Sequence, residues 1–212
     1  MSELGHKAVA GFGERAQEPF EDIPTDPEAF LRWGTTLDRH HPYKYELSNG
    51  KVSRMMIQVS RAHARVAKNI LVELDQLLDD KRFEAGAAEF GVKTAGGVRY
   101  PDIFVDRASD DLKGLACEAP ILIAEVLSPS TAGRDFTEKL HEYTAIASVQ
   151  TYLICSQDEP RAWVWSRQSD GSWPHLPLEL AGRDGAIPLG GLGIELAMAA
   201  AFRGIPDPPT VA

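Results

Sequence analysis

The sequence predicts a single α/β domain with a central mixed β-sheet and helices on both sides. Three patterns support this fold class: apolar residues at helical spacing after residue 60, an apolar run over residues 121–127, and an Asn-Gly pair between two short extended runs. A chain of 212 residues with 43% hydrophobic and 25% charged residues has the size and composition of one soluble globular domain.

The first half of the chain predicts a short helix, a hairpin and a long helix. The helix begins after Thr25-Asp26-Pro27-Glu28, which supplies an N-cap residue and an early proline, and ends near residue 38 before His40-His41-Pro42. The Asn49-Gly50 pair predicts a hairpin between residues 45–47 and 51–53. From Ser60 to about residue 80, apolar residues share one helical face; they are Val66, Ile70, Leu74, Leu77 and Leu78.

The second half predicts most of the sheet. We expect strands over residues 83–90 and 98–106, split by a turn at Gly96-Gly97, and a central strand over 121–127 that is covered on both faces. A loop follows at Ser128-Pro129-Ser130. We expect a helix over residues 135–147 that buries Phe136, Leu140, Tyr143 and Ala147. We also expect a pair of strands over residues 151–156 and 161–167. We expect turns over 185–192 and a short helix over 194–202.

The predicted domain occupies residues 25–203. Residues 1–24 read as a flexible leader, because glycine, proline and charged residues occur there without a period, and residues 204–212 read as a disordered tail. No apolar run approaches the ~20 residues of a membrane-spanning helix, and the first residues lack the apolar stretch of a signal peptide. We therefore expect a cytoplasmic protein that does not contact a membrane.

The charge of the chain is unevenly distributed. The net charge is −9, from 22 Lys and Arg against 31 Asp and Glu. This charge argues against a surface covered with basic residues that would bind nucleic acid. Residues 51–68 nevertheless carry +5 and no carboxylate, so the remaining residues must carry −14. Within this segment Arg61, Arg65 and Lys68 fall on one stripe of the predicted helix. The stripe indicates either a local nucleic-acid-binding face or simply a solvated helix surface.

Two acidic residues are candidates for chemistry. Asp102 lies in the predicted strand around residues 100–105, and Glu125 interrupts the apolar strand 121–127. A buried carboxylate is costly unless it is paired, protonated or bound to a cation. If the two strands are neighbours, the carboxylates converge where Mg²⁺ could bind, and such an ion could activate a water molecule against a phosphodiester. The alternative is that Glu125 is a carboxylate at the end of a strand that pairs with Arg134 or Lys139 or accepts hydrogen bonds from loop amides.

Several of these segments resemble a known family. Pro101-Asp102, the block IAEVLSPSTAGRDFTEKLHEY (residues 123–143) and TYLI (residues 151–154) closely resemble the Uma-type family within the PD-(D/E)XK superfamily of restriction endonucleases. The segment YELSNGK (residues 45–51) also resembles the opening hairpin of that family. The resemblance extends roughly from residue 43 to 202 and implies a restriction-endonuclease-like α/β fold.

The resemblance also implies roles for individual residues. Asp102 and Glu125 match the acidic residues of the motif and are implied to be metal ligands, while Glu46 matches an upstream acid that could complete the metal shell. The motif lysine is missing, because Leu127 stands two residues after Glu125. Lys139 on the next helix is the expected substitute, since its long side chain can lean inward from the border between buried and solvated surface. The alternative is a pair with Asp135 one turn earlier.

The predicted nucleic-acid contacts are Arg61, His63, Arg65 and Lys68. His63 falls where the first long helix of the family often begins with a histidine, so it could carry a proton or contact phosphate; a ring bonded to the backbone is the alternative. Together these features predict a Mg²⁺- or Mn²⁺-dependent endonuclease that hydrolyses DNA, and two cuts in a duplex would suit a homodimer. The rivals are a catalytically silent nuclease fold used for binding or assembly, and a metal hydrolase acting on a small phosphoester.

Overall fold

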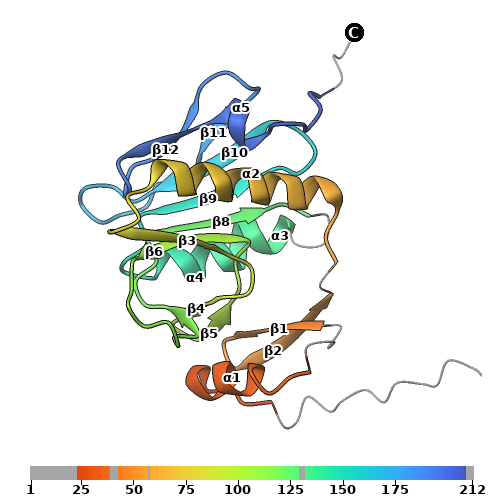
Figure 1. The fold of residues 1–212 in the computed structure, drawn as a ribbon, viewed down its shortest axis with the longest axis vertical. Coiled ribbons are helices and arrows are strands. Elements are labelled where there is room, and N and C mark those ends of the chain that lie inside the picture. The colour runs from red at the N-terminus through yellow and green to blue at the C-terminus, as the bar shows by residue number, and fades with distance from the viewer. Residues whose placement is uncertain (1–22, 39–42, 57, 129–131, 209–212) are drawn as a thin grey trace, which may run out of the picture.

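The central element of the fold is a six-stranded mixed sheet (Figure 1). The computed structural model of the chain describes residues 23–38, 43–56, 58–128 and 132–208. The strand order is β11–β10–β9–β8–β6–β3, in which β8 and β9 are parallel and the other pairs antiparallel. The strands are β3 (Phe83–Ala87), β6 (Ile103–Arg107), β8 (Leu122–Val126), β9 (Thr151–Cys155), β10 (Arg161–Ser166) and β11 (Leu178–Ala181).

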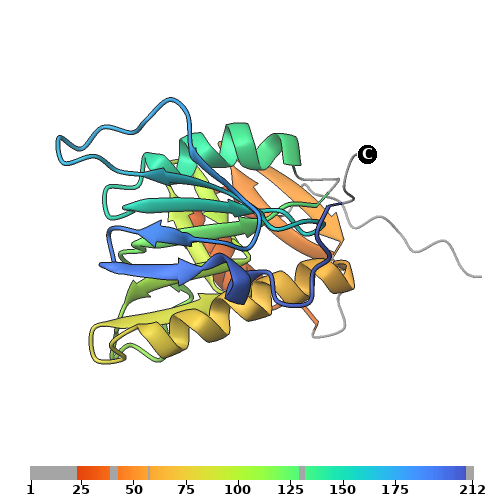
Figure 2. The ribbon, with the colours of Figure 1, turned by 90° about the horizontal axis from the view of Figure 1, so that it is seen from above.

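Helices cover both faces of this sheet, as Figure 2 shows from above. Helix α2 (Arg61–Leu77) lies on one face together with the hairpin β12 (Ala186–Leu189) and β13 (Ile194–Ala197) and the short helix α5 (Met198–Ala201). A continuous helical segment made of α3 (Ala132–Arg134), η2 (Asp135–Lys139) and α4 (Leu140–Thr144) lies on the other face. This arrangement confirms the predicted α/β class with a mixed sheet.

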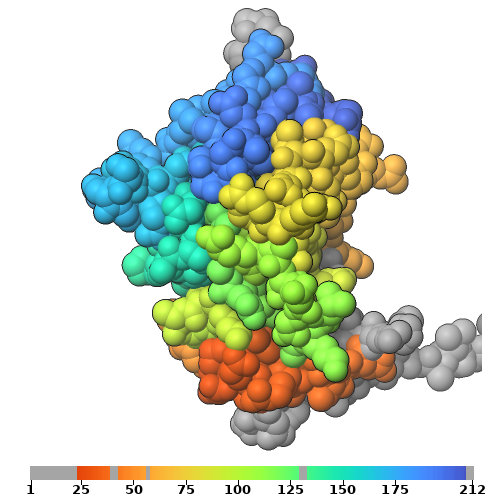
Figure 3. Space-filling view, turned by 60° about the vertical axis from the view of Figure 1, so that its left-hand side comes forward, coloured from red at the N-terminus to blue at the C-terminus, as the bar shows by residue number. Residues whose placement is uncertain are grey.

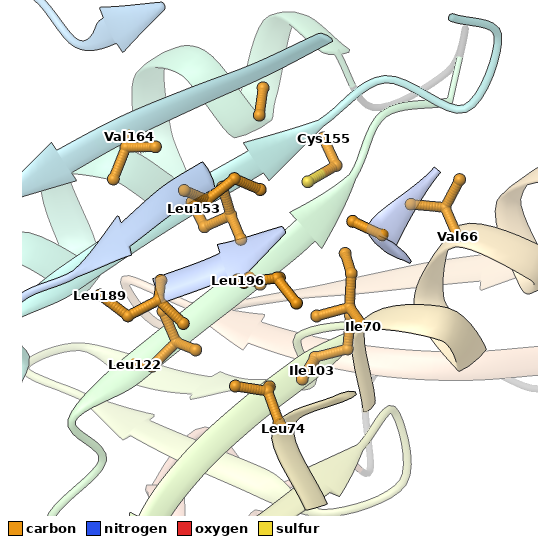
Figure 4. Close-up of a cluster of buried hydrophobic side chains, with 14 of the residues drawn as sticks. Val66, Ile70, Leu74, Ile103, Leu122, Leu153, Cys155, Val164, Leu189 and Leu196 are labelled. Atoms are coloured by element: carbon orange, nitrogen blue, oxygen red, sulfur yellow. The ribbon is translucent and has the colours of Figure 1, made fainter. Parts of the chain in front are cut away.

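The main core forms between α2 and the sheet (Figure 4). Val66, Ile70 and Leu74 are fully buried along one face of α2, and they pack in one cluster with Leu122 and Leu153 of the sheet. The predicted helical stripe is therefore correct in its centre. Its last members are not: Leu77 is 43% exposed and Leu78 only half-buried, because α2 ends at Leu77 rather than near residue 80.

A smaller five-stranded sheet stands at the N-terminal end of the molecule, where Figure 3 shows the first elements in red and orange. Its strand order is β2–β1–β5–β4–β7, and helix α1 (Pro27–Gly34) packs against it. Its strands are β1 (Tyr43–Ser48), β2 (Lys51–Met56), β4 (Gly91–Thr94), β5 (Gly97–Arg99) and β7 (Ala116–Cys117).

Two predicted local signals are confirmed here. Asn49 and Gly50 have φ of 49° and 72°, the left-handed conformation that a tight hairpin turn between β1 and β2 requires. Ser60 caps α2, because its side chain accepts a hydrogen bond from the backbone N–H of His63 at 3.0 Å.

The predictions for residues 83–90 and 98–106 need correction. The strand in the first range is β3, which ends at Ala87 and is followed by a turn, while the second range divides into β5 and β6, which belong to different sheets. The Gly96-Gly97 turn joins β4 to β5 instead. The break between β5 and β6 falls at Tyr100-Pro101-Asp102, where proline has no N–H to donate to a ladder, so the chain leaves one sheet and enters the other.

The predictions for three later segments also need correction. The helix predicted over 135–147 runs from Ala132 to Thr144. Of its predicted buried residues, Tyr143 is buried, Phe136 and Leu140 are half-buried against the core and Ala147 is exposed, while Asp135 and Lys139 are buried as well. Residues 185–192 contain a strand, and residues 194–202 begin with a strand before α5, because the two segments pair as a hairpin. Strand β11 was not predicted.

Some predicted features fall on residues outside those described. These are most of the leader, residues 39–42 after α1, and Pro129-Ser130 of the loop after β8. Of the predicted tail, Ile205 is described: its side chain is 3% exposed in the main core and its carbonyl accepts a hydrogen bond from Arg183. Within the described ranges, none of the helices has the length and apolar character needed to cross a membrane.

Candidate active site

A pocket of about 600 Å³ lies where the hairpin β1–β2, the ends of β6 and β8 and the start of α2 meet. It gathers side chains that are far apart in the sequence. The pocket is lined by all four residues predicted as catalytic or metal-binding, namely Glu46, Asp102, Glu125 and Lys139. His63, a predicted nucleic-acid contact, also lines it. Further lining residues that matter for the chemistry are Lys44, Tyr100, Arg134 and Gln157.

Asp102 stands just before β6, next to the end of β8. The register pairs Ile103 with Ala124, so Asp102 lies beside the Glu125–Val126 end of the neighbouring strand. Its Oδ2 accepts a hydrogen bond from the backbone N–H of Val126 at 2.8 Å and lies 3.1 Å from Nε2 of His63. Burial alone would raise the pKa of Asp102, but the hydrogen bond and charge of His63 outweigh it and the pKa is lowered.

Glu125 is more deeply buried than Asp102: the side chain of Glu125 is 4% exposed. Its Oε1 accepts hydrogen bonds from Nζ of Lys139 at 2.9 Å and from the hydroxyl of Tyr143 at 3.0 Å. Burial raises the pKa of Glu125 to about 7; Lys139 opposes this shift, while the charges of Asp102 and Asp135 add to it. The β6–β8 register and the shared pocket place the two carboxylates beside each other.

Lys139 connects the helical segment to the sheet. Its Nζ lies 2.9 Å from Glu125 and 3.0 Å from Oδ1 of Asp135, so both partners considered from the sequence are bound at once. The expected border position is wrong, because Lys139 is only 4% exposed. The reason is the π-helical turn η2, whose wider backbone carries Asp135 and Lys139 on its buried side. Burial alone would lower the pKa of Lys139, but Glu125 and its acidic neighbours raise it.

An ammonium group lies beside Glu125 although the motif lysine is missing from the sequence. Leu127 continues beyond β8 as an apolar residue whose backbone N–H donates to the carbonyl of Cys155 at 2.8 Å. The ammonium beside Glu125 comes instead from Lys139, on the helical segment that covers this face of the sheet.

His63 is buried in the first turn of α2, and Nε2 of its ring lies 3.1 Å from Oδ2 of Asp102; the backbone of Val126 also contributes to holding the ring. Burial would lower the pKa of His63, but the hydrogen bond and charge of Asp102 raise it. The other ring nitrogen, Nδ1, is buried without a hydrogen-bond partner among the described residues. His63 and Asp102 therefore stabilise each other on the wall of the pocket, as an ion pair when the ring of His63 is protonated.

Glu46 has partners of its own. Its Oε2 accepts a hydrogen bond from Nη1 of Arg99 at 2.8 Å and lies 3.6 Å from Nη2 of Arg134. In the described part of the chain no three His, Cys, Asp or Glu side chains form a group that could hold a metal ion. Glu46, Asp102 and Glu125 line one pocket but do not form a three-ligand cluster.

Sequence reasoning missed the arginine that holds Glu46. Arg99 is completely buried, and its Nε and Nη2 donate to the two carboxylate oxygens of Glu142 at 2.7 and 2.8 Å. Ser48 adds a hydrogen bond to Glu142 at 2.6 Å. This network ties the small sheet to the helical segment that carries Lys139. The sequence signal for this network is the spacing of Glu138 and Glu142, which lie one helical turn apart on the same helix face and could both meet a cation such as Arg99.

The basic stripe lies apart from the pocket. Arg61, Arg65 and Lys68 are all exposed on α2, but none of them lines the pocket. Arg65 also has a structural partner, since its Nη1 donates to the carbonyl of Gly204 at 2.7 Å. Of the four predicted nucleic-acid contacts, only His63 lies at the pocket.

The sequence and the fold can both be compared with known proteins. A family model named Uma2 and described as "Putative restriction endonuclease" matches residues 27–199. The chain belongs to the Uma2 family. The match includes the hairpin β1–β2, the two carboxylate-bearing strands and the helical segment with Lys139, so the pocket lies entirely within the Uma2 domain.

Relatives of this Uma2 chain occur in cyanobacteria. It is 25% identical to the uncharacterized protein slr1290 of Synechocystis sp. over 194 residues. The aligned residues cover 90% of this chain and 98% of slr1290. The chain is 31% identical over 133 residues to the uncharacterized protein sll1609 of the same organism, or 60% of this chain and 74% of that protein. A crystal structure from Anabaena variabilis, described as a putative nuclease belonging to DUF820, has the same fold with a TM-score of 0.61 and 18% identity, over 81% of this chain and 96% of that one.

Proposed function

We propose that the protein is a divalent-metal-dependent endonuclease that hydrolyses phosphodiester bonds in DNA. The observation that supports this best is the convergence of Asp102, Glu125 and Lys139 on one pocket, with the ammonium of Lys139 held on Glu125. Two carboxylates and one buried cation, drawn from neighbouring strands and a covering helix, are the groups that metal-assisted hydrolysis of a phosphodiester needs.

The donor atoms of the pocket fit Mg²⁺ or Mn²⁺. Oδ1 of Asp102 and Oε2 of Glu125 accept no hydrogen bond from the described residues, so one hard oxygen of each carboxylate remains for a cation. Mg²⁺ is commonly held by one or two carboxylates, with water and substrate oxygens completing its shell. When bound, the ion would supply a Lewis acid and an acidified water molecule. We assign Glu46 to Arg99 and Arg134 rather than to the metal, since its carboxylate already has those partners.

The other side chains of the pocket have distinct tasks in this proposal. Lys139 neutralises Glu125 in the metal-free protein and would offset charge that develops on the phosphate. His63 keeps Asp102 ionised, since the pKa of that carboxyl is lowered by the histidine. Arg134 at the pocket wall has long contacts to Glu46 and Glu138, at 3.6 and 3.7 Å, which leave its guanidinium able to turn towards a phosphate.

DNA is the substrate that we favour over a small phosphoester. The support is the exposed stripe of Arg61, Arg65 and Lys68 on the helix that begins at the pocket, in a chain whose remaining charge is strongly negative. The description of the family as restriction endonucleases agrees with it. A homodimer would place two such pockets on one duplex, one for each strand.

A catalytically silent member of the family, used for binding or assembly, is the second candidate. The observation that favours it is the full engagement of Lys139 between Glu125 and Asp135, which resembles a structural ion cluster as much as a catalytic one. The absence of a three-ligand metal group among the described residues points the same way.

Supercoiled plasmid DNA separates the two candidates. The purified protein should nick or linearise the plasmid with Mg²⁺ or Mn²⁺ and leave it intact with EDTA. Intact plasmid under all three conditions, with protein that binds DNA and is folded, would favour the silent module. Cleavage that persists in EDTA would refute metal dependence.

A further inference from the structure

A second pocket opens beside the first. It has a volume of about 330 Å³ and lies between helix α1 and strand β1. Four residues line both pockets, namely Lys44, Ala88, Glu89 and Tyr100. Tyr100 stands two positions before Asp102, so the second pocket begins at the wall of the site that carries the carboxylates.

Aromatic rings make up much of the second pocket, and they come from three separate elements. They are Phe30, Trp33, Tyr43, Tyr45 and Tyr100. The rings are already packed against one another: Trp33 meets Tyr45 edge to face at 5.2 Å and lies 5.6 Å from Phe30. Phe30 and Tyr45 are buried in the core of the small sheet, whereas Trp33, Tyr43 and Tyr100 are half-buried. A half-buried ring such as that of Trp33 offers an apolar face on which another planar ring can stack.

Lys44 stands at the boundary between the two pockets. Its Nζ donates to the carbonyl of Ala88 at 2.6 Å and to that of Tyr100 at 3.1 Å, and it lies 5.2 Å from the centre of the Tyr100 ring. An ammonium has three N–H donors, so one remains beyond these two bonds. A ligand that reaches both pockets therefore passes the amine of Lys44, whose pKa is lowered by burial, between an aromatic cavity and an acidic one.

We propose that the aromatic pocket holds one unpaired nucleobase next to the phosphodiester in the acidic pocket. This rests on the proposed nuclease function and adds its substrate class: single-stranded DNA, or a duplex with an unpaired base. A nucleotide has the parts that this arrangement requires. Its planar base suits the aromatic pocket, its negatively charged sugar–phosphate link passes Lys44, and the next phosphate lies in the acidic pocket. A base that is stacked and paired inside a duplex cannot enter such a pocket without leaving the stack.

The overall charge of the chain supports this class. With a net charge of −9 the protein gains little from long-range attraction to a duplex backbone. Stacking of a base on aromatic rings needs no such field and tolerates any base sequence. The aromatic pocket thus supplies binding where the electrostatics of the chain are weak.

Binding without cleavage tests the proposal, with labelled oligonucleotides and fluorescence anisotropy in EDTA. One probe is a short single strand, another is its duplex, and a third is the single strand with one central abasic site. The first variant is Trp33→Leu, which removes a ring but keeps an apolar side chain. The second is Gly34→Leu, which adds bulk to the pocket lining; nothing lies within 4 Å of a Cβ at Gly34, so the backbone tolerates it. Gly34→Ala is the matched control.

The wild type should bind the single strand more tightly than the duplex. Trp33→Leu should weaken single-strand binding by about 5- to 150-fold, the range that loss of one stacked base corresponds to, and leave duplex binding unchanged. Gly34→Leu should weaken it too, while Gly34→Ala should not. The abasic strand should bind the wild type weakly and show little further loss with Trp33→Leu.

Equal binding of single strand and duplex, equal losses on both, no loss in either variant, or no binding of any probe would each overturn the proposal. Its failure is distinct from that of the proposed function. Plasmid cleavage with Mn²⁺ and unaltered single-strand binding by the variants would keep the nuclease and remove the base pocket. Selective loss of single-strand binding without metal-dependent cleavage would do the reverse.

Discussion

Nζ of Lys139 lies 2.9 Å from Oε1 of Glu125, and both side chains are about 95% buried. The pair joins the helical segment to the central sheet, and Asp135 adds a second carboxylate at 3.0 Å. Two buried carboxylates are tolerated here because one buried ammonium lies between them. Under the proposed function, catalysis and stability therefore depend on the same lysine.

Replacing this lysine should destabilise the protein strongly. Lys139→Ala leaves Glu125 and Asp135 buried without their cation, so we expect the free energy of unfolding to fall by about 3–5 kcal/mol. Urea denaturation at neutral pH measures this, with the exposed Lys68→Ala as control, which should change it by less than about 0.5 kcal/mol. A loss below about 1 kcal/mol for Lys139→Ala would mean that the buried pair contributes no more than a surface salt bridge.

Glu125 predicts a specific dependence of stability on pH. Burial raises its pKa from 4.5 to about 7, so between those values the folded protein holds a proton that the unfolded chain has lost. Stability should therefore fall as pH rises from about 5 to 6.5, by at most about 1.4 kcal/mol per pH unit for one proton. Denaturation of the metal-free protein in EDTA at several pH values measures the slope.

Glu125→Gln should remove this slope, and the exposed Glu84→Gln should keep it. His63 contributes at higher pH: its pKa is raised, so its contribution to stability is full below about 6.5 and is lost as pH rises through the raised value. A second fall above that pH should remain in Glu125→Gln. An unchanged slope between about pH 5 and 6.5 in Glu125→Gln would assign it to another group.

Arg99 should be among the most sensitive positions for folding. It is fully buried and makes hydrogen bonds to Glu46 and Glu142. Arg99→Met therefore removes the cation that both carboxylates bind and leaves Glu46 with only the longer contact to Arg134. We expect a loss of about 3–5 kcal/mol or failure to fold. Arg203→Met is the control, because Arg203 is exposed and lies 3.7 Å from Glu73. Similar stability of both variants, measured by urea denaturation, would refute a structural role for the network.

The basic stripe of α2 should affect DNA binding through salt dependence. Arg65 also bonds to Gly204, so the clean test is the double variant Arg61→Ala, Lys68→Ala. If both side chains contact phosphates of a duplex, the slope of log K against log salt should decrease in magnitude by about 1.8. Titrations in EDTA at several salt concentrations measure this slope. The same slope in wild type and double variant would remove the stripe from the DNA interface.

The sequence predicted best what depends on neighbouring residues. Ser60 capped α2 and Asn49-Gly50 formed the turn, because both effects act within a few residues. The convergence of Asp102 and Glu125 was predicted on the condition that their strands are neighbours, and β6 and β8 do pair. Pro101 marked a change of sheet that periodicity alone read as one long strand.

What could not be predicted depends on contacts that are distant in sequence. Arg99 meets Glu46 and Glu142 across 53 and 43 residues, and no local pattern announces such a pair. The π-helical turn that buries Lys139 was equally hidden, since its residues have the spacing of an ordinary α-helix and only the partners in the sheet favour the wider turn.

The central claim is that Asp102 and Glu125 hold the metal that cleaves DNA, and cleavage of supercoiled plasmid by Asp102→Asn in Mn²⁺ tests it most directly. Asparagine keeps an oxygen for the N–H of Val126 but loses the charge that a cation needs. The wild type and the control Asp110→Asn, a change at an exposed acid outside the pocket, should cleave equally in Mn²⁺ and not in EDTA. Folded Asp102→Asn should not cleave under either condition. Wild-type cleavage by Asp102→Asn would contradict the account.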